Sequence, residues 1–248
     1  MSKKNKRLRV FAGPNGSGKT TLYNYLVRIN AFTPYYHINP DQISVDLPVA
    51  VNLSHWPITF TPEEIIAYLD ASPFSAKTNT SLSKSIIVED KVIRLRNQCQ
   101  EGTSYISAAL AAFLREKLLV SGSSFSYESV FSHTTKVDEL AKAKEQGYRI
   151  YLYYISTGDP MINKNRVQTR VELGGHAVPE GKIESRYYNS LKNLYNAVLL
   201  SDRAFFFDNS SVIHNNSYAF FAEKKDDKLF TITSELPYWF DEYFLKRQ

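Results

Sequence analysis

Short apolar runs alternate along most of the chain with longer stretches in which apolar residues recur every three or four positions. The runs predict buried strands, and the stretches predict amphipathic helices. The predicted strands cover residues 8–12, 35–39, 123–131, 148–156 and 204–210. The predicted helices cover residues 19–29, 61–69, 103–122, 136–147, 159–175 and 179–200. This alternation is typical of an α/β fold with a mostly parallel sheet and helices on both faces.

The pattern loosens between residues 47 and 103, where Pro, Ser and Thr are frequent. We interpret this segment as a large insertion after the second strand. It contains one clear helix start, because Thr61 can cap a helix, Pro62 suits its first position and Glu64 completes a capping box. Residues 81–97 fit either a strand or a helix.

The chain ends in a predicted hairpin at 218–233 and a predicted helix at 235–245. They form a C-terminal extension, at about 212–248. We expect one domain over residues 1–248, carrying both the insertion at 47–103 and this extension.

Glycine is concentrated between the first predicted strand and the first predicted helix. The segment GPNGSGKT, Gly13–Thr20, matches the G-x-x-x-x-G-K-[ST] pattern of a phosphate-binding loop, or P-loop. Glycines there let successive backbone N–H groups point at phosphate oxygens, and the following helix adds its positive N-terminal end. Lys19 would reach the β and γ phosphates, and the Thr20 hydroxyl would ligate Mg²⁺. The residues expected to bind ATP here are Gly13, Pro14, Asn15, Gly16, Ser17, Gly18, Lys19, Thr20 and Thr21.

Composition and charge narrow the class of protein. The 248 residues are 43% hydrophobic, enough for a sizeable core, yet no apolar run approaches the ~20 residues of a membrane span. The single cysteine, Cys99, excludes an internal disulfide framework, and the apolar segment behind the basic N-terminus is too short for a signal peptide. We therefore expect a cytoplasmic protein. The net charge of +5 is scattered, which argues against nucleic acid and suits small anionic ligands.

Polar residues at the carboxyl ends of the predicted strands are the next candidates, because ligands bind there in open α/β sheets. Asp41 follows the second strand, where a catalytic role and a helix N-cap fit equally well. Glu128 lies among apolar residues of the strand at 123–131, and an unpaired carboxylate there would be costly. We expect Glu128 to meet a metal, a cation or substrate hydroxyls; the alternative is a buried salt bridge.

Arg166 and Arg170 lie one helical turn apart, so their side chains share a helix face. Such a pair suits a γ-phosphate, whose charge spreads over its oxygens during transfer. The alternative is two solvated arginines on an exposed face, but the GGHAVP loop that follows favours the first interpretation. Arg186, on the next helix, is a further candidate. His176 in that loop is interpreted as a positioning residue.

Six segments together resemble one family. In chain order they are GPNGSGKTTL, INPDQI, YESVFSH, KEQGYRIYLYYIS, RVQTRVELGGHAVPEGKIESRYYNSL and FFFDNS. This ordered set is similar to the zeta-toxin family of P-loop kinases, and more narrowly to its chromosomal branch, often labelled predicted ABC-type ATPase. The resemblance covers residues 9–46 and about 104–210.

The resemblance implies ATP- and Mg²⁺-dependent phosphorylation of a hydroxyl on a nucleotide-sugar such as UDP-N-acetylglucosamine, with an antitoxin as a candidate partner. It assigns the base to Asp41, the phosphate-loop lysine to Lys19 and the strand carboxylate near substrate to Glu128. Arg166 matches the arginine of the lid helix, and Arg170 follows it in this branch. Asn209 and Ser210 fall where the adenine-contacting loop lies. The acceptor would meet Asp41, Glu128 and Arg186.

Two other functions lack their sequence signatures here. An ABC-like or AAA-like ATPase should carry an apolar strand that ends in Asp-Glu, and ABC proteins an L-S-G-G-Q signature; the sequence has neither. Asp208 at the end of AFFFD could imitate the metal-binding acid, but no glutamate follows it. A polynucleotide 5′-kinase should show a concentrated basic groove, whereas Lys and Arg are scattered here.

Overall fold

The computed structural model describes residues 6–78, 81–97, 102–174, 178–211 and 218–247. It divides the chain into two compact units. Unit 1 comprises Met1–Tyr35 and Ser126–Gln248, and unit 2 comprises Tyr36–Phe125. The expected insertion at 47–103 falls inside unit 2, which extends beyond it on both sides.

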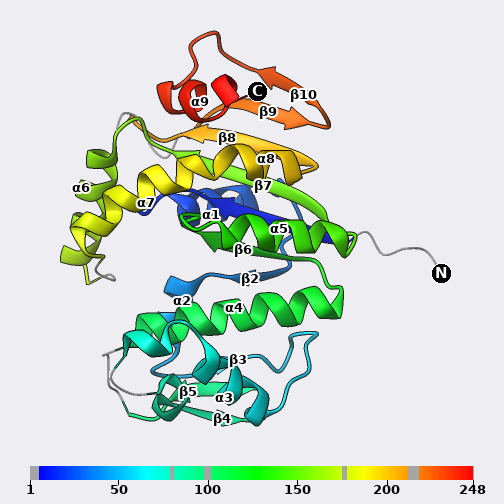
Figure 1. Ribbon diagram of the computed structural model, residues 1–248, viewed down its shortest axis with the longest axis vertical. Helices are drawn as coiled ribbons and strands as arrows, with labels where there is room; N and C mark the ends of the chain where they lie inside the picture. The colour runs from blue at the N-terminus through cyan, green and yellow to red at the C-terminus, as the bar shows by residue number, and fades with distance from the viewer. Residues whose placement is uncertain (1–5, 79–80, 98–101, 175–177, 212–217, 248) are drawn as a thin grey trace. The chain divides into compact units, whose positions relative to one another are not determined.

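A seven-stranded sheet has the order β10-β9-β8-β7-β1-β6-β2 (Figure 1). Its strands are β1 (Arg7–Ala12), β2 (Tyr36–Ile38), β6 (Phe125–Ser129), β7 (Arg149–Ser156), β8 (Arg203–Asp208), β9 (Ala219–Lys225) and β10 (Lys228–Thr231). Strand β7 runs parallel to both β1 and β8, whereas β9 and β10 add an antiparallel hairpin at one edge. The mostly parallel sheet and the C-terminal hairpin are therefore confirmed.

The helices of unit 1 cover both faces of this sheet. They are α1 (Lys19–Arg28), α5 (Thr135–Glu145), α6 (Pro160–Glu172), α7 (Glu180–Lys192), α8 (Leu194–Leu200) and α9 (Tyr238–Tyr243). Side chains alternate between the two faces along a strand. On one face, Tyr153 of β7 packs against α1 and against Phe11, and the ring centroids of Tyr153 and Phe11 lie 4.7 Å apart. On the other face, the Tyr154 hydroxyl contacts Ser190 of α7 at 2.9 Å, and its ring lies 5.8 Å from that of Trp239.

The predicted helix at 179–200 is divided into α7 and α8 at Asn193. The side chain of Asn193 is buried, and its Nδ2 donates to the carbonyl of Phe131, at 2.9 Å. A buried amide needs such a partner, and this contact lies where the helix breaks.

Unit 2 contains α2 (Pro40–Asp46), α3 (Pro62–Ala71) and α4 (Thr103–Ser121), with a small sheet in the order β3-β5-β4. Its strands are β3 (Val51–Asn52), β4 (Ile86–Glu89) and β5 (Val92–Leu95). Residues 81–97, whose sequence fits either a strand or a helix, form a short 3₁₀ turn and the β4–β5 hairpin, with Asp90 in the left-handed region (φ 50°) at its turn.

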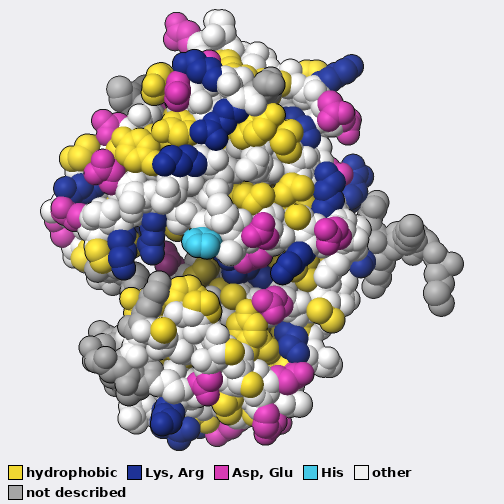
Figure 2. Space-filling view, viewed as in Figure 1, with side chains coloured by type: hydrophobic (Ala, Val, Ile, Leu, Met, Phe, Trp, Pro, Cys, Tyr) yellow, Lys and Arg dark blue, Asp and Glu magenta, His cyan; other side chains and the backbone are white. Residues whose placement is uncertain are grey.

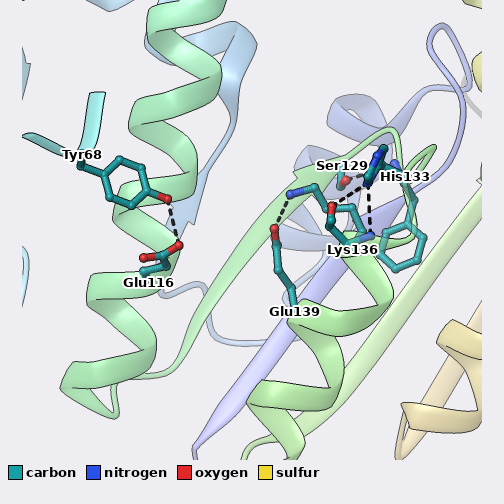
Figure 3. Close-up of polar contacts among 8 residues, drawn as sticks. Tyr68, Glu116, Ser129, His133, Lys136 and Glu139 are labelled. Atoms are coloured by element: carbon teal, nitrogen blue, oxygen red, sulfur yellow. Dashed lines mark hydrogen bonds and ion pairs between the residues drawn. The ribbon is translucent and has the colours of Figure 1, made fainter. Parts of the chain in front are cut away.

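The capping box predicted for α3 is present. The Thr61 hydroxyl accepts a hydrogen bond from the Glu64 backbone, and the Glu64 carboxylate accepts one from the Thr61 backbone. Tyr68 of α3 donates to Glu116 of α4 at 2.9 Å (Figure 3). The predicted insertion therefore has packed structure of its own. Within the part of the chain that the structure describes, no helix is both long and apolar enough to cross a lipid bilayer.

Candidate nucleotide-binding site

The P-loop connects β1 to α1. Its glycines are needed both for the backbone conformation of the turn and because neighbouring atoms leave no room for side chains. Gly13, Gly16 and Gly18 have φ values of 147°, 74° and 99°, which residues with side chains rarely adopt. A Cβ at these positions would lie 2.0 Å from Ile155 O, 2.7 Å from Asn163 O and 2.8 Å from Asn209 Nδ2, respectively. The loop therefore fits tightly against the ends of β7 and β8 and against α6.

Direct hydrogen bonds hold the same elements to the loop. Asn163 of α6 is fully buried, and its Nδ2 donates to the Asn15 carbonyl at 2.6 Å. Asn209, just after β8, donates through its side chain to the Ser17 carbonyl at 2.9 Å. The end of β6 joins them, because the Gly13 backbone donates to the carbonyl of Ser129. Asn163 was not predicted from the sequence; its place three residues before Arg166 is the only hint.

Lys19 is the first residue of α1, and Gly18 caps that helix in the left-handed conformation. The Lys19 ammonium donates to the carbonyls of Gly13 and Pro14, at 2.9 and 2.8 Å. Its charge therefore lies over the loop, where the N-terminal end of α1 also favours an anion.

Thr20 and Glu128 are brought together at the start of α1. The Thr20 hydroxyl donates to Oε2 of Glu128 at 2.7 Å, and Glu128 is only 5% exposed. The hydroxyl predicted to ligate Mg²⁺ and the predicted strand carboxylate are thus direct neighbours. Both are oxygen ligands of the kind that Mg²⁺ prefers.

The donor set near Thr20 fits a magnesium ion carried on a nucleotide. Among the described residues, no three His, Cys, Asp or Glu side chains lie close enough together to hold a metal by themselves. Mg²⁺ usually keeps several waters and binds one or two protein oxygens together with substrate phosphates. The Thr20 hydroxyl, oriented by the adjacent Glu128 carboxylate, meets that need.

A tight turn fixes the end of β6 and with it Glu128. Phe131 has a positive φ of 58°, and its backbone N–H donates to the Ser129 hydroxyl at 3.1 Å. Next along the chain, His133 Nδ1 accepts from the Thr135 backbone, and Lys136 pairs with Glu139 (Figure 3). These contacts lie at the start of α5, which follows the turn in the chain.

Arg166 and Arg170 of α6 are both half-buried, so the alternative of two solvated arginines is wrong for this helix. Arg166 Nη1 is buried and has no hydrogen-bond partner among the described residues. Burial lowers the pKa of Arg166, while Tyr218 and Asp208 act in the opposite direction. A guanidinium held this way beside a phosphate loop favours an anionic ligand.

Three buried polar atoms around the loop lack partners among the described residues: Asn15 Oδ1, Ser17 Oγ and Arg166 Nη1. Leaving a buried polar group unsatisfied costs about 1–3 kcal/mol, more for a charged group. Such a concentration points to a polar ligand that completes the site. ATP with Mg²⁺ fits this requirement, because its phosphates offer acceptors to the hydroxyl and the guanidinium.

Both oxygens of Asp208 are engaged within the protein. Oδ2 accepts from the indole N–H of Trp239 at 2.7 Å, and Oδ1 accepts from the Ser210 backbone at 2.8 Å. Asp208 is therefore a structural acceptor, which removes the one residue that imitated the metal-binding acid of ABC-like ATPases. Trp239 was not predicted, because its contact joins segments that lie far apart in the sequence.

Two described residues that follow β8, Ser210 and Tyr218, make contacts near the P-loop. The Ser210 hydroxyl accepts from the Gly158 backbone at 2.7 Å, and the Tyr218 hydroxyl donates to the Gly18 carbonyl at 3.4 Å. Burial raises the pKa of Tyr218 and outweighs a hydrogen bond with Thr21 and the charge of Arg166, which lower it. The adenine-contacting role of Asn209 stays a prediction.

Asp41 is exposed and lies in the first turn of α2, in unit 2. The N-cap of that helix is Asn39, whose Oδ1 accepts from the Asp41 backbone at 2.9 Å. The N-cap interpretation of Asp41 is therefore wrong, and the base interpretation stays a prediction. Arg186 is partly buried on α7, whereas His176 lies outside the described residues.

Comparisons with known proteins establish the fold. No protein-family profile matches the chain. An uncharacterised protein from Haemophilus influenzae is 35% identical over 63 residues, which cover 25% of this chain and 45% of that protein.

Among solved structures, a chain of AvrRxo1-ORF1:AvrRxo1-ORF2 with sulphate ions aligns with a TM-score of 0.55 at 15% identity, covering 96% of this chain and 63% of that chain. A chain of the PezAT chromosomal toxin–antitoxin system of Streptococcus pneumoniae aligns with a TM-score of 0.52 at 14% identity, covering 99% and 80%. This chain thus spans less than two thirds of the Haemophilus and AvrRxo1 proteins. Likeness at such identities shows the fold alone, a mixed α/β fold with a mostly parallel sheet.

Proposed function

We propose that the protein is an ATP- and Mg²⁺-dependent phosphotransferase with an alcohol acceptor. The observation that carries the proposal is the P-loop site itself. Three separate elements converge on the loop, and they leave a hydroxyl, an amide and a guanidinium buried around it without partners among the described residues. This is the arrangement expected of a preorganised site that awaits a polyphosphate.

Each residue then has a defined role. Lys19 would exchange its loop carbonyls for the β and γ phosphates, and Thr20, oriented by Glu128, would ligate Mg²⁺. Bound Mg²⁺ supplies neutralisation of phosphate charge. Arg166 would hold the transferring phosphoryl group, with Arg170 one turn further along α6. Asp41, assigned by the family resemblance, would accept the proton of the acceptor hydroxyl.

The acceptor is proposed to be a nucleotide-sugar such as UDP-N-acetylglucosamine, and an antitoxin is proposed as a protein partner. Support for the partner is the fold, since the similar chains come from a toxin–antitoxin system and from the AvrRxo1-ORF1:-ORF2 complex. One of the similar AvrRxo1 structures contains ATP. Its chain aligns with this one with a TM-score of 0.53 at 14% identity. Support for the acceptor is the resemblance alone.

A polynucleotide kinase is less well supported. On the face shown in Figure 2, Lys and Arg side chains are interspersed with Asp and Glu. Recognition of a polynucleotide backbone favours a continuous basic stripe.

The direct test is phosphate transfer from γ-labelled ATP by Lys19→Ala and Lys228→Ala proteins. Lys19→Ala should lose turnover and bind ATP more weakly, because it deletes the charge over the loop. Lys228→Ala removes an exposed lysine on β10 and should match the parent protein. Turnover by Lys19→Ala at the parent rate would show that the loop does not bind a triphosphate.

A further inference from the structure

A series of three hydrogen bonds connects α7, the end of β7, α6 and the P-loop. The hydroxyl of Tyr187 on α7 donates to the carbonyl of Thr157 at 2.6 Å. The hydroxyl of Thr157, just after β7, donates to Oδ1 of Asn163 on α6. Nδ2 of Asn163 in turn donates to the carbonyl of Asn15 in the P-loop at 2.6 Å. The proposed function uses only the last of these contacts.

The middle of this series is closed to water. Thr157 and Asn163 are fully buried, and Tyr187 is only 3% exposed. A buried hydroxyl or amide costs free energy unless it is hydrogen-bonded. Valine at position 157 would have nearly the same shape as threonine without that requirement. We therefore look for the role of Thr157 and Asn163 in what their hydrogen bonds hold in place.

The Thr157 hydroxyl fixes the direction in which the Asn163 amide points. An asparagine amide has an oxygen that accepts hydrogen bonds and a nitrogen that donates them. Because Oδ1 accepts from Thr157, Nδ2 faces the Asn15 carbonyl, and the reverse orientation would break both contacts. Thr157 thus acts on the loop through Asn163.

The backbones of α6 and the P-loop also meet at Asn163. A Cβ on Gly16 would lie only 2.7 Å from the carbonyl oxygen of Asn163. Arg166 follows Asn163 by three residues, so the two side chains are neighbours on the surface of α6. A shift of Asn163 relative to the loop would therefore move the guanidinium of Arg166 as well.

We propose that Asn163 is a positioning residue, oriented by Thr157, that holds Asn15 of the P-loop and Arg166 of α6 in one fixed arrangement. The part of Arg166 in phosphoryl transfer rests on the proposed function, whereas the hydrogen-bonded series does not. Asn163 acts through these two residues and not by contact with the reacting atoms. A misplacement of about 1 Å can cost 10²-fold in rate, so loss of the Asn163 side chain should slow transfer.

The first test needs no turnover. Backbone hydrogen exchange of peptides that cover residues 13–18 is measured by mass spectrometry in the full-length parent, Asn163→Ala and Ser190→Ala proteins. Ser190→Ala is the matched control, because it removes another buried contact between α7 and β7, the one with the Tyr154 hydroxyl at 2.9 Å. The loop should exchange faster in Asn163→Ala and like the parent in Ser190→Ala. Equal exchange in the parent and Asn163→Ala would overturn the proposal.

Variants of Thr157 repeat the test without removing the asparagine. Thr157→Val keeps the shape of the side chain and deletes the donor, so the loop should exchange faster, and this variant decides the question if Asn163→Ala does not fold. Thr157→Ser retains the hydroxyl and should behave like the parent. Parental exchange in Thr157→Val would contradict the orienting role of the hydroxyl.

Kinetics separate a positioning role from a purely structural one. We expect kcat for transfer from γ-labelled ATP to fall on the order of 10²-fold in Asn163→Ala. In an Arg166→Ala background the same change should cause a much smaller further loss, because the group that Asn163 positions is already absent. Full additivity of the two changes would overturn the proposal. Absence of turnover in the parent protein would refute the proposed function, and hydrogen exchange would still decide the role of Asn163.

Discussion

At the scale of single residues, the contact between Thr20 and Glu128 links the P-loop to the neighbouring strand. Glu128 is buried and accepts a hydrogen bond from the Thr20 hydroxyl, so it fixes the direction in which the Thr20 oxygen lone pairs point. A residue that orients a metal ligand in this way typically changes metal affinity by about 10–100-fold when it is replaced.

Glu128→Gln should therefore raise the Mg²⁺ concentration needed for half-maximal ATP turnover by roughly 10–100-fold. The amide keeps the size of the side chain but removes its charge. Turnover is measured against Mg²⁺ concentration at fixed ATP, with the exposed Glu235→Gln as the matched control. An unchanged Mg²⁺ dependence would leave Glu128 as a purely structural acceptor.

Arg166→Lys tests the unpaired guanidinium of α6. Arginines that stabilise charge in phosphoryl transfer contribute on the order of 10³–10⁵ in rate, and lysine lacks the planar fork. We expect a large loss of kcat with a smaller change in the KM for ATP. Arg28→Lys, exposed at the end of α1, is the control. Parental kcat in Arg166→Lys would contradict the assignment of Arg166 to the transferring group.

The sequence could identify Lys19, Thr20 and Glu128 because their chemistry is carried by a local motif or by an ionisable residue in an apolar strand. It could not identify Asn163 or Trp239. Asn163 becomes part of the site only when α6 docks on the loop, at a distance of 148 positions along the chain from Asn15. An amide in a helix and an indole near a terminus carry no such signal by themselves.

At the scale of elements, helix α9 supports the site from the C-terminal extension. Trp239 is almost fully buried against Phe221 and Phe240, and its indole N–H satisfies Asp208 beside the loop residue Asn209. The extension therefore belongs to the architecture of the nucleotide site.

Trp239→Phe should keep most of the packing and remove the hydrogen bond to Asp208. Hydrogen bonds to charged groups contribute about 1.5–3 kcal/mol, so we expect Tm to fall by roughly 3–12 °C. The KM for ATP should rise as well, because the loop after β8 loses an anchor. Tyr238→Phe, an exposed neighbour on α9, should change neither quantity. A normal KM together with a lowered Tm would confine α9 to a role in stability.

Elements with strong periodicity were predictable, and elements set by tertiary contacts were not. The capping box of α3 and the extent of the helix predicted at 103–122 were correct because helix start and stop signals are local in sequence. The break at Asn193 and the hairpin at 81–97 depend on a buried carbonyl partner and on pairing between strands, respectively. Neither feature can be predicted from the pattern of apolar residues in a short stretch of sequence.

At the scale of the whole molecule, the proposed transfer to an alcohol acceptor is tested through Asp41. Asp41→Asn is the informative variant, because Asn39 caps α2 and the substitution leaves that cap in place. We expect Asp41→Asn to fold and to bind ATP normally, while transfer falls by about 10²–10⁴-fold, the usual contribution of a general base.

The acceptor prediction is tested by incubating the protein with ATP, Mg²⁺ and UDP-N-acetylglucosamine and weighing the products by mass spectrometry. A species heavier than the sugar nucleotide by one phosphoryl group should form with the parent protein and be nearly absent with Asp41→Asn. If UDP-N-acetylglucosamine stays unaltered while another metabolite acquires label from γ-labelled ATP, the kinase proposal holds and this acceptor is wrong. If nothing acquires label although ATP is consumed, the protein is an ATPase, and the alcohol acceptor must be abandoned.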